Sequence, residues 1–404
     1  MKKPELLAPA GDLEKLKFAV HYGADAVYIG GKQFGLRAKA GNFDYEDMKE
    51  GIAFANRYGS KVYVAANIIA HNEDLTGAEA FFEQLADIGI HAVIIADPSL
   101  IRVCQRVAPD LEIHLSTQAS VTNWRSVLFW KHQGVERVVL AREVTMGEIE
   151  KIKEKVDVEI ETFIHGAMCI SYSGRCVLSN HMTDRDANRG GCAQSCRWKY
   201  DLFEDGTDET VNVSETSELA YTMSSKDLSM VEHIPQLIEN GVDSLKIEGR
   251  MKSVHYLATV VNVYRKIIDT YMEDPVNFHI DQEWIDEIWK AAQRSLTTAF
   301  YFKDPSEEDQ LFGKPEQIPK YNFCGLVLDY DGQTQLATIQ QRNPFKIGDD
   351  VEFFGPDFYR FQQKITWMID ENENSIDIAK QPMMKVKVKV DKPVTYFNMM
   401  RKQR

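Results

Sequence analysis

Residues 22–30 read YGADAVYIG, a short turn around Gly23 followed directly by a run of apolar residues. The same order of glycine turn and apolar run returns as YGSKVYVAAN (58–67), IGIHAVIIAD (88–97), QGVERVVLA (133–141) and NGVDSLKIEG (240–249). A glycine at this place is typical of the C-terminal end of a helix, where the backbone turns before the next element. The repeated pattern therefore predicts helices that lead into buried β-strands.

Eight apolar runs, most of them followed by a helical pattern, indicate βα units around a parallel sheet. Eight units with a spacing of about 30 residues favour a closed TIM-type (β/α)8 barrel. An open doubly wound sheet is the alternative, but no GxGxxG motif follows the first strand. The predicted strands lie at residues 6–8, 26–29, 62–66, 92–96, 113–115, 137–140, 158–163 and 244–247.

The chain of 404 residues is longer than one hydrophobic core usually supports, so we expect two domains. The predicted barrel covers residues 1–302 and contains a cysteine-rich insertion, residues 165–223, after the seventh strand. An acidic, proline-containing segment, residues 303–319, is predicted to be a linker. Alternating apolar runs in residues 320–404 then predict a small antiparallel β-barrel domain.

The formal net charge is −14, which argues against nonspecific adhesion to nucleic acid or to an anionic membrane. Residues 385–404 differ, since they carry seven basic side chains and a single acid. This basic stretch is either a contact for a polyanion such as RNA or a set of charges that protects an edge strand from aggregation. The RNA-binding candidates are Lys385, Lys387, Lys389 and Lys392, followed by Arg401, Lys402 and Arg404.

Composition also bears on the compartment. No stretch approaches the roughly 18 uninterrupted apolar residues that a membrane span needs, and we expect no membrane partner. Six cysteines in a chain of this length, with no apolar signal segment in the opening residues, favour reduced thiols over a disulfide framework. We therefore expect a cytoplasmic protein.

Four of the six cysteines lie within residues 161–198, ETFIHGAMCISYSGRCVLSNHMTDRDANRGGCAQSCRW. Glycines and serines surround them, so the segment is a loop rather than part of a core. The spacing contains no CxxC pair, which is unusual for structural zinc, whereas iron–sulfur clusters tolerate widely spaced loop ligands. Three readings remain open: an iron–sulfur cluster, best a cuboidal 4Fe–4S cluster; a zinc site; and redox disulfides. The candidate metal ligands are Cys169, Cys176, Cys192 and Cys196.

In a barrel of this type, polar residues at the carboxyl ends of the strands collect on one face and form the active site. Several cations occur at such positions, and converging arginines suit a small di-anionic molecule or an RNA backbone. The candidate substrate-binding residues are Asn67, Gln118, Arg142, Arg197, Lys246 and Arg250. The candidate catalytic residues are Glu161, His165 and Glu248. No HExxH, GxSxG or other protease constellation is present.

These segments resemble a known family. ETFIHGAMCISYSGRCVLS (161–179) and NRGGCAQSCRW (188–198) are similar to the defining motif of the collagenase-like peptidases of family U-32. ELLAPAGDLEKLKFAVHYGADAVYIG (5–30), SSKDL (224–228) and KIEGRMK (246–252) agree with it, so the resemblance extends over nearly all of the main domain. The C-terminal domain resembles that of the branch of the family that hydroxylates tRNA.

The resemblance implies two different activities. The family name implies a peptidase; the branch implies an enzyme that forms 5-hydroxyuridine at the wobble position of tRNA, in a pathway that depends on prephenate and an iron–sulfur cluster. The implied partners are then the tRNA anticodon loop, prephenate as a small dicarboxylate co-substrate, and a paralogous family member or a second copy of the chain. A noncatalytic tRNA-binding scaffold is the third hypothesis. Four thiols, a cationic face and a basic stretch favour RNA modification.

Overall fold

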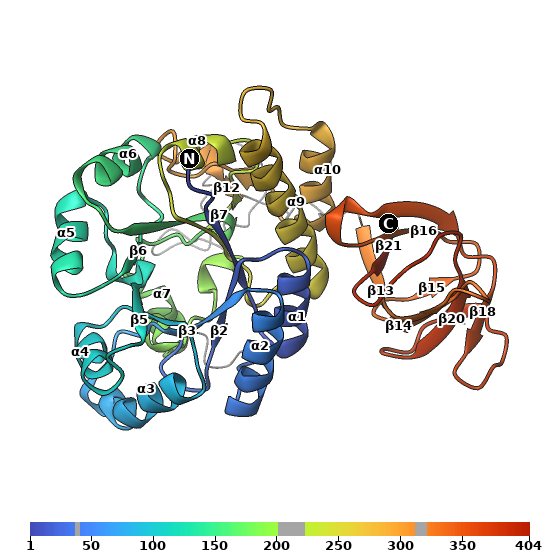
Figure 1. The fold of residues 1–404 in the computed structure, drawn as a ribbon, viewed down its shortest axis with the longest axis horizontal. Helices are drawn as coiled ribbons and strands as arrows, with labels where there is room; N and C mark the ends of the chain where they lie inside the picture. The colour runs from blue at the N-terminus through green and yellow to red at the C-terminus, as the bar shows by residue number, and fades with distance from the viewer. Residues whose placement is uncertain (37–40, 201–222, 312–320) are drawn as a thin grey trace, which may run out of the picture.

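The computed structural model of the chain describes residues 1–36, 41–200, 223–311 and 321–404. The larger domain is a closed barrel of eight parallel strands surrounded by helices, as predicted (Figure 1). The strands follow one another in chain order, and the last of them pairs with both the first and the seventh. They are β1 (Glu5–Pro9), β2 (Ala26–Gly30), β3 (Lys61–Ala66), β4 (Ala92–Ile95), β5 (Glu112–Leu115), β6 (Arg137–Val139), β7 (Glu159–Ala167) and β10 (Ser244–Ile247).

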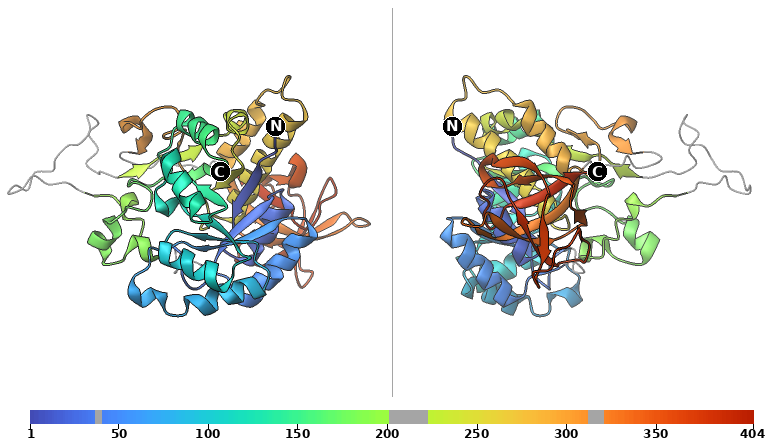
Figure 2. Two further views of the ribbon diagram at one scale, coloured as in Figure 1. Left: turned by 60° about the vertical axis from the view of Figure 1, so that its left-hand side comes forward. Right: turned by 90° about the vertical axis from the view of Figure 1, so that its right-hand side faces the viewer.

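Helices cover the outside of the barrel (Figures 1 and 2). Short polar side chains begin several of them: Asp12, Asp44, Asp97, Asn123 and Thr145 each accept a hydrogen bond from a backbone N–H of the first turn. Such caps satisfy donors that have no partner within the helix. The helices are α1 (Leu13–His21), α2 (Tyr45–Arg57), α3 (Ala78–Asp87), α4 (Pro98–Val107), α5 (Trp124–His132), α6 (Met146–Lys155), α8 (Ile234–Glu239), α9 (Val254–Glu273) and α10 (Gln282–Ala291).

The cysteine-rich insertion follows β7 at the carboxyl end of the barrel, as predicted. Its described elements are α7 (Leu178–Thr183), η3 (Ala187–Arg189) and η4 (Ser195–Arg197). The chain then returns through β8 (Ser224–Ser225) and β9 (Asp227–Ser229), and β9 runs antiparallel to the end of β7. Strand β11 (Leu296–Thr297) pairs with β9 in parallel.

The segment predicted to be a linker, residues 303–319, contacts the barrel domain in its first part. It contains η5 (Glu307–Asp309) and β12 (Gln310–Leu311), and β12 pairs with β8. Asp309 is buried and accepts a hydrogen bond from the Thr297 hydroxyl at 2.6 Å. The structured part of the barrel domain therefore extends to Leu311, while the rest of the predicted linker lies outside the described residues.

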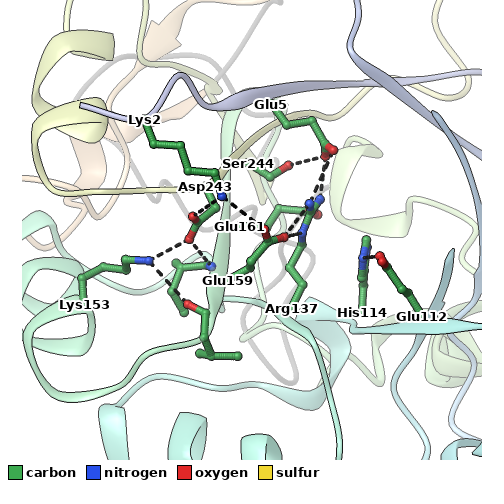
Figure 3. A network of polar contacts seen from close by, with 12 residues as sticks. Lys2, Glu5, Glu112, His114, Arg137, Lys153, Glu159, Glu161, Asp243 and Ser244 are labelled. Carbon is green, nitrogen blue, oxygen red and sulfur yellow. Dashed lines mark hydrogen bonds and ion pairs between the residues drawn. The ribbon is translucent and has the colours of Figure 1, made fainter. Parts of the chain in front are cut away.

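Charged side chains fill the barrel interior at the amino ends of the strands (Figure 3). Arg137 is 4% exposed and forms ion pairs with Glu5, Glu159 and Glu161, with N–O distances of 2.6, 2.8 and 3.2 Å. The Tyr63 hydroxyl donates to Glu5 at 2.6 Å. Buried charges are tolerated only when they are paired in this way, so the network fixes β1, β6 and β7 relative to one another.

The C-terminal domain is an antiparallel half-barrel sheet with the strand order β17-β16-β21-β13-β14-β20-β18. The prediction of a small antiparallel β-domain is confirmed; within the described residues its two end strands do not pair with each other. The strands are β13 (Tyr321–Asp331), β14 (Leu336–Gln341), β16 (Asp350–Phe354), β17 (Arg360–Lys364), β18 (Met368–Asp370), β20 (Lys385–Lys389) and β21 (Met399–Gln403), with a separate pair of β15 (Phe345–Lys346) and β19 (Ile378–Ala379).

This domain packs against α9 and α10 on the side of the barrel (Figures 1 and 2). Every residue of α9 from Val254 to Tyr264 is buried, because the sheet covers the face of the helix that points away from the barrel. Arg401 of β21 is fully buried between Glu287 of α10 and Glu352 of β16, at 2.6 and 2.5 Å. Among the described helices, none is both long and apolar enough to cross a lipid bilayer.

Candidate functional site

A pocket of about 190 Å³ opens at the carboxyl ends of the barrel strands and is roofed by the cysteine-rich insertion. It brings together most of the residues that the sequence singled out. The four predicted metal ligands, called the cysteine quartet below, all line it. The other predicted residues in its lining are Asn67, Gln118, Arg142, Arg197, Lys246, Glu248 and Arg250.

Two glycines allow the insertion to lie against the mouth of the barrel. Gly166 has a φ of 106°, and a Cβ there would lie 2.2 Å from the carbonyl oxygen of Glu248. Gly174 has a φ of 72°, and a Cβ there would lie 2.0 Å from the carbonyl oxygen of Gln118. Only glycine combines the positive φ with so close an approach. The backbone of the insertion is therefore seated directly on two loops that line the pocket.

Polar contacts hold the second half of the insertion. Arg189 forms ion pairs with Glu73 and Asp74, which lie between β3 and α3, at 2.5 and 2.8 Å. Next to it, the Asn188 side chain donates to the carbonyl oxygen of Cys176 at 3.0 Å. The loop that carries two of the quartet is thus tied to the barrel on the side of β3.

The quartet forms a loose set of sulfur donors. Burial raises the pKa of Cys196, Arg197 opposes this effect, and the charges of the other three thiols add to the rise. Within the described residues, however, no three Cys, His, Asp or Glu side chains converge closely enough to hold one metal ion.

The cations line the pocket from different strands. Lys246, at the end of β10, is 4% exposed; its Nζ lies 2.7 Å from Glu161 and 4.6 Å from the centre of the Tyr28 ring. The guanidinium of Arg142 lies 4.1 Å above the Phe163 ring. These aromatic contacts orient the two cations while leaving their charge on the pocket side.

Three further contacts fix the arginines. One nitrogen of Arg142 donates to the carbonyl oxygen of Ala167 at 2.8 Å, and another lies 3.2 Å from the carboxylate of Glu248. Arg250 donates to the carbonyl oxygen of Leu36. It also lies so close to Gly30 that a Cβ there would be 2.1 Å from its nitrogen. The pocket therefore contains more positive than negative charge, with Glu248 as the carboxylate in its lining.

Glu161 and His165 are predicted catalytic residues that the structure does not place in the pocket lining. Glu161 is 0% exposed and lies beneath Lys246. Burial alone would raise its pKa, but Lys246 and Arg137 outweigh that effect and hold the pKa at about 2. This carboxylate therefore stays ionised and positions Lys246.

His165 lies on the other side of β7. The register between β7 and β10 shifts between Lys246 and Ile247, so the alternation that puts Glu161 and Phe163 in the barrel interior does not continue to His165. Its ring nitrogen lies 3.1 Å from the Tyr264 hydroxyl of α9, and burial lowers its pKa to about 3. A neutral, packed histidine is the result.

The amide side chains and some neighbours complete the lining. Asn67 accepts a hydrogen bond from the backbone N–H of Leu36 at 3.1 Å. Tyr172, which the sequence analysis did not select, lines the pocket and is 61% exposed. Ser173 also lines it and donates through its backbone N–H to Glu143 at 2.9 Å. Tyr172 could have been identified from the sequence, because it is an aromatic residue within a polar, glycine-rich loop.

The basic stretch is distributed over different surroundings. Lys385, Lys387 and Lys389, the β20 lysines, are exposed on one face of β20, while the valines between them are buried. Strand β20 pairs with β14 on one side and β18 on the other, so it is not an edge strand and the edge-protection hypothesis is wrong for these lysines. Lys392 is exposed as well.

The last three basic residues of the stretch form contacts within the protein. Arg401 is buried between the domains, so its predicted contact with a polyanion is wrong. Lys402 forms an ion pair with Asp349 at 2.7 Å, and Arg404 donates to the Asn322 side chain at 2.8 Å.

Comparison with known proteins agrees with this architecture. The tRNA hydroxylation protein P1 of Bacillus subtilis (strain 168) is 57% identical over 401 residues, covering 99% of this chain and 95% of that protein. The tRNA hydroxylation protein P of Escherichia coli (strain K12) is 34% identical over 419 aligned positions, covering 93% and 90%. The 23S rRNA 5-hydroxycytidine C2501 synthase of the same organism is 38% identical over 270 positions, covering 67% of this chain and 40% of that protein. Residues 11–311 match Peptidase family U32 and residues 319–401 match the Peptidase family U32 C-terminal domain, so the chain belongs to peptidase family U32.

Proposed function

We propose that this chain is an RNA-modifying enzyme that hydroxylates uridine at the wobble position of tRNA, forming 5-hydroxyuridine. The observation that carries the proposal is the pocket, in which sulfur donors, cations and side-chain amides line one space at the carboxyl ends of the strands. The relatives named as tRNA hydroxylation proteins, and the rRNA hydroxycytidine synthase, support hydroxylation of a pyrimidine base.

Each group in the pocket has a role in this proposal. Uracil presents one N–H donor and two carbonyl acceptors along its edge, and the amides of Asn67 and Gln118 supply the complementary donors and acceptors. The exposed ring of Tyr172 offers a surface on which an unstacked base would lie. Lys246 and Arg250 suit the carboxylates of a small dicarboxylic acid, and we assign prephenate as the co-substrate.

The quartet would hold an iron–sulfur cluster, for which the donor set fits better than for zinc. Within the described residues, four thiols and no histidine line the pocket, and the sequence spacing of the four cysteines contains no CxxC pair. Such a cluster supplies electron transfer when bound. Replacing the C5 hydrogen of uracil by hydroxyl is a two-electron oxidation, so the reaction requires an external two-electron acceptor and a source of the oxygen atom. One nitrogen of Arg142 lies 3.9 Å from the Cys169 sulfur, where it offsets part of the negative charge of four thiolates.

A peptidase receives no comparable support. Within the described residues, no histidine lines the pocket, so neither its serines nor its thiols have an imidazole base beside them. The Ser173 hydroxyl lies 3.3 Å from Glu143, whose carboxylate also accepts from the Ser173 backbone. A noncatalytic scaffold would not require a lined pocket of this kind.

Nucleoside mass spectrometry of tRNA tests the proposal. A strain that lacks the gene should lose 5-hydroxyuridine and nucleosides derived from it, and the intact gene should restore them. Lys246→Met should fail to restore them, whereas a control with Lys131→Met, an exposed lysine on α5, should succeed. Unchanged tRNA in the deletion strain, together with cleavage of gelatin by the pure protein, would decide for the peptidase.

A further inference from the structure

Two cations pair with a single buried carboxylate beside the pocket, and a third cation lies near them. The carboxylate belongs to Asp227 of β9, which is 3% exposed. Lys252, just before α9, lies 3.5 Å from one of its oxygens, and Arg294, just after α10, lies 3.7 Å from the other. Both distances exceed the roughly 2.7–2.9 Å of a charge-assisted hydrogen bond. Asp227 is thus shared loosely between two cations.

Arg197 is the third cation. It lines the pocket and follows Cys196 in η4. Within the ranges that the structure describes, it forms no ion pair, although it is close enough to act on the other two cations. Burial lowers the pKa of Lys252 and of Arg294, and the positive charge of Arg197 lowers both further.

The charge at this place is therefore unbalanced, which is unlike the domain interface. There, Arg401, Lys290 and Arg360 face Glu287, Glu352 and Glu283, three cations against three carboxylates. Here three cations face Asp227 alone among the carboxylates with which they pair in the described residues. Their partial burial would strengthen the attraction for an incoming anion, because solvent screens it less.

The position of the cluster indicates which anion it receives. Lys252 and Arg294 are absent from the lining of the pocket, whereas Arg197 belongs to it. An anion bound by all three would therefore lie outside the pocket, at the side where Arg197 stands. A small co-substrate held by Lys246 and Arg250 does not extend that far, but a polymer whose base enters the pocket continues past its rim.

We propose that Arg197, Lys252 and Arg294 bind one phosphate group of the RNA chain, next to the nucleotide whose base enters the pocket. This inference rests on the proposed function, since it takes RNA to be the substrate. The side chains of Lys252 and Arg294 are 14% and 21% exposed, so a phosphate can reach them.

The test measures how binding of a synthetic anticodon stem-loop RNA, with uridine at the wobble position, depends on salt between 50 and 200 mM. Lys252→Gln with Arg294→Gln should remove one phosphate contact. The slope of log affinity against log salt should then fall by about 0.7, so that salt weakens binding about 2.6-fold less than in the wild type. The matched control is Arg106→Gln with Lys131→Gln, on α4 and α5, which removes two exposed cations far along the chain from this cluster and should leave the slope unchanged.

Two further measurements separate a binding role from a structural one. Asp227→Asn removes the competing carboxylate and should tighten RNA binding, an effect in the opposite direction that misfolding does not produce. An RNA with one neutral methylphosphonate linkage beside the target uridine should bind the wild type more weakly, while the double variant should not distinguish it from normal RNA.

The results that overturn the inference are distinct. Wild-type protein that binds RNA, with an unchanged slope in the double variant, overturns the phosphate site alone. If the double variant raises the KM for the dicarboxylate but leaves the salt slope of RNA binding unchanged, the cations serve the co-substrate instead. Wild-type protein that does not bind RNA at all would overturn both this inference and the proposed function.

Discussion

Replacing Glu161 by glutamine should destabilise the barrel by about 3 kcal/mol at pH 7. The carboxylate is fully buried between Lys246 and Arg137, at 2.7 and 3.2 Å, and its pKa is about 2 instead of its ordinary 4.5. That difference corresponds to about 3 kcal/mol in favour of the folded, ionised form, the size expected when one partner of a buried pair is removed.

The contribution has a defined pH dependence. Because the folded pKa is lowered, the stabilisation is complete above about pH 4.5 and is lost as the pH falls toward 2. At pH 3.5 about 2 kcal/mol of it should remain, so the difference in stability between wild type and Glu161→Gln should narrow by roughly 1 kcal/mol relative to pH 7.

Urea unfolding followed by tryptophan fluorescence measures this, since five of the six tryptophans lie in residues 1–302. Glu46→Gln, which removes an exposed carboxylate, is the control and should leave stability unchanged. Adding Lys246→Met to Glu161→Gln should recover part of the loss, because no uncompensated ammonium then remains buried. Equal stability of wild type and variant at pH 7, or a gap that widens in acid, would refute the reasoning.

Three other predictions follow from the site and the interface. Serine in place of any member of the quartet should remove iron, acid-labile sulfide and the brown absorbance from anaerobically purified protein. Serine at Cys104 or Cys324 should not, because burial raises the pKa of these thiols to about 12. Stoichiometric zinc without sulfide in the wild-type protein would contradict this prediction. Glutamine at all three β20 lysines should lower the slope of log tRNA affinity against log salt by up to about 2 and leave the absorbance of the iron–sulfur cluster intact. The control is a variant with glutamine at Lys131, Lys151 and Lys155. If both variants show the same unchanged slope, β20 does not contact RNA. Arg401→Met removes the fully buried partner of Glu287 and Glu352 and leaves them with Lys290 and Arg360, so it should cost about 3 kcal/mol. It should also make the β-domain more sensitive to limited proteolysis than Lys364→Met does, and identical digestion patterns would show that the buried pair is not needed for docking.

The barrel could be predicted because its signals are local. A glycine turn, an apolar run and a polar residue at the strand end occur within about ten residues of one another, and the topology then gathers the strand ends on one face. Asn67, Gln118, Arg142 and Lys246 were found in this way. The quartet was found because its residues lie in one loop.

The remaining features depend on contacts between distant residues. The pairing of Glu161 with Lys246 joins positions 85 residues apart, and a register shift that no pattern reveals turns His165 toward α9. Arg401 looked like part of a basic surface because its partner Glu287 lies 114 residues away. Lys252 is the last residue of the KIEGRMK motif but Arg294 belongs to no motif, and only the packing of two helix ends against β9 brings them together.

The burial of α9 on all sides bears on how the protein is made. A helix on the outer ring of an isolated barrel keeps a polar stripe toward water, whereas the polar stripe of α9, which consists of His255, Thr259 and Asn262, is buried. During synthesis, residues 321–403, which form the covering sheet, emerge from the ribosome only after the barrel strands. Until then this face of α9 has no covering, so the interface between the barrel and the sheet can be completed only after the whole sheet has emerged.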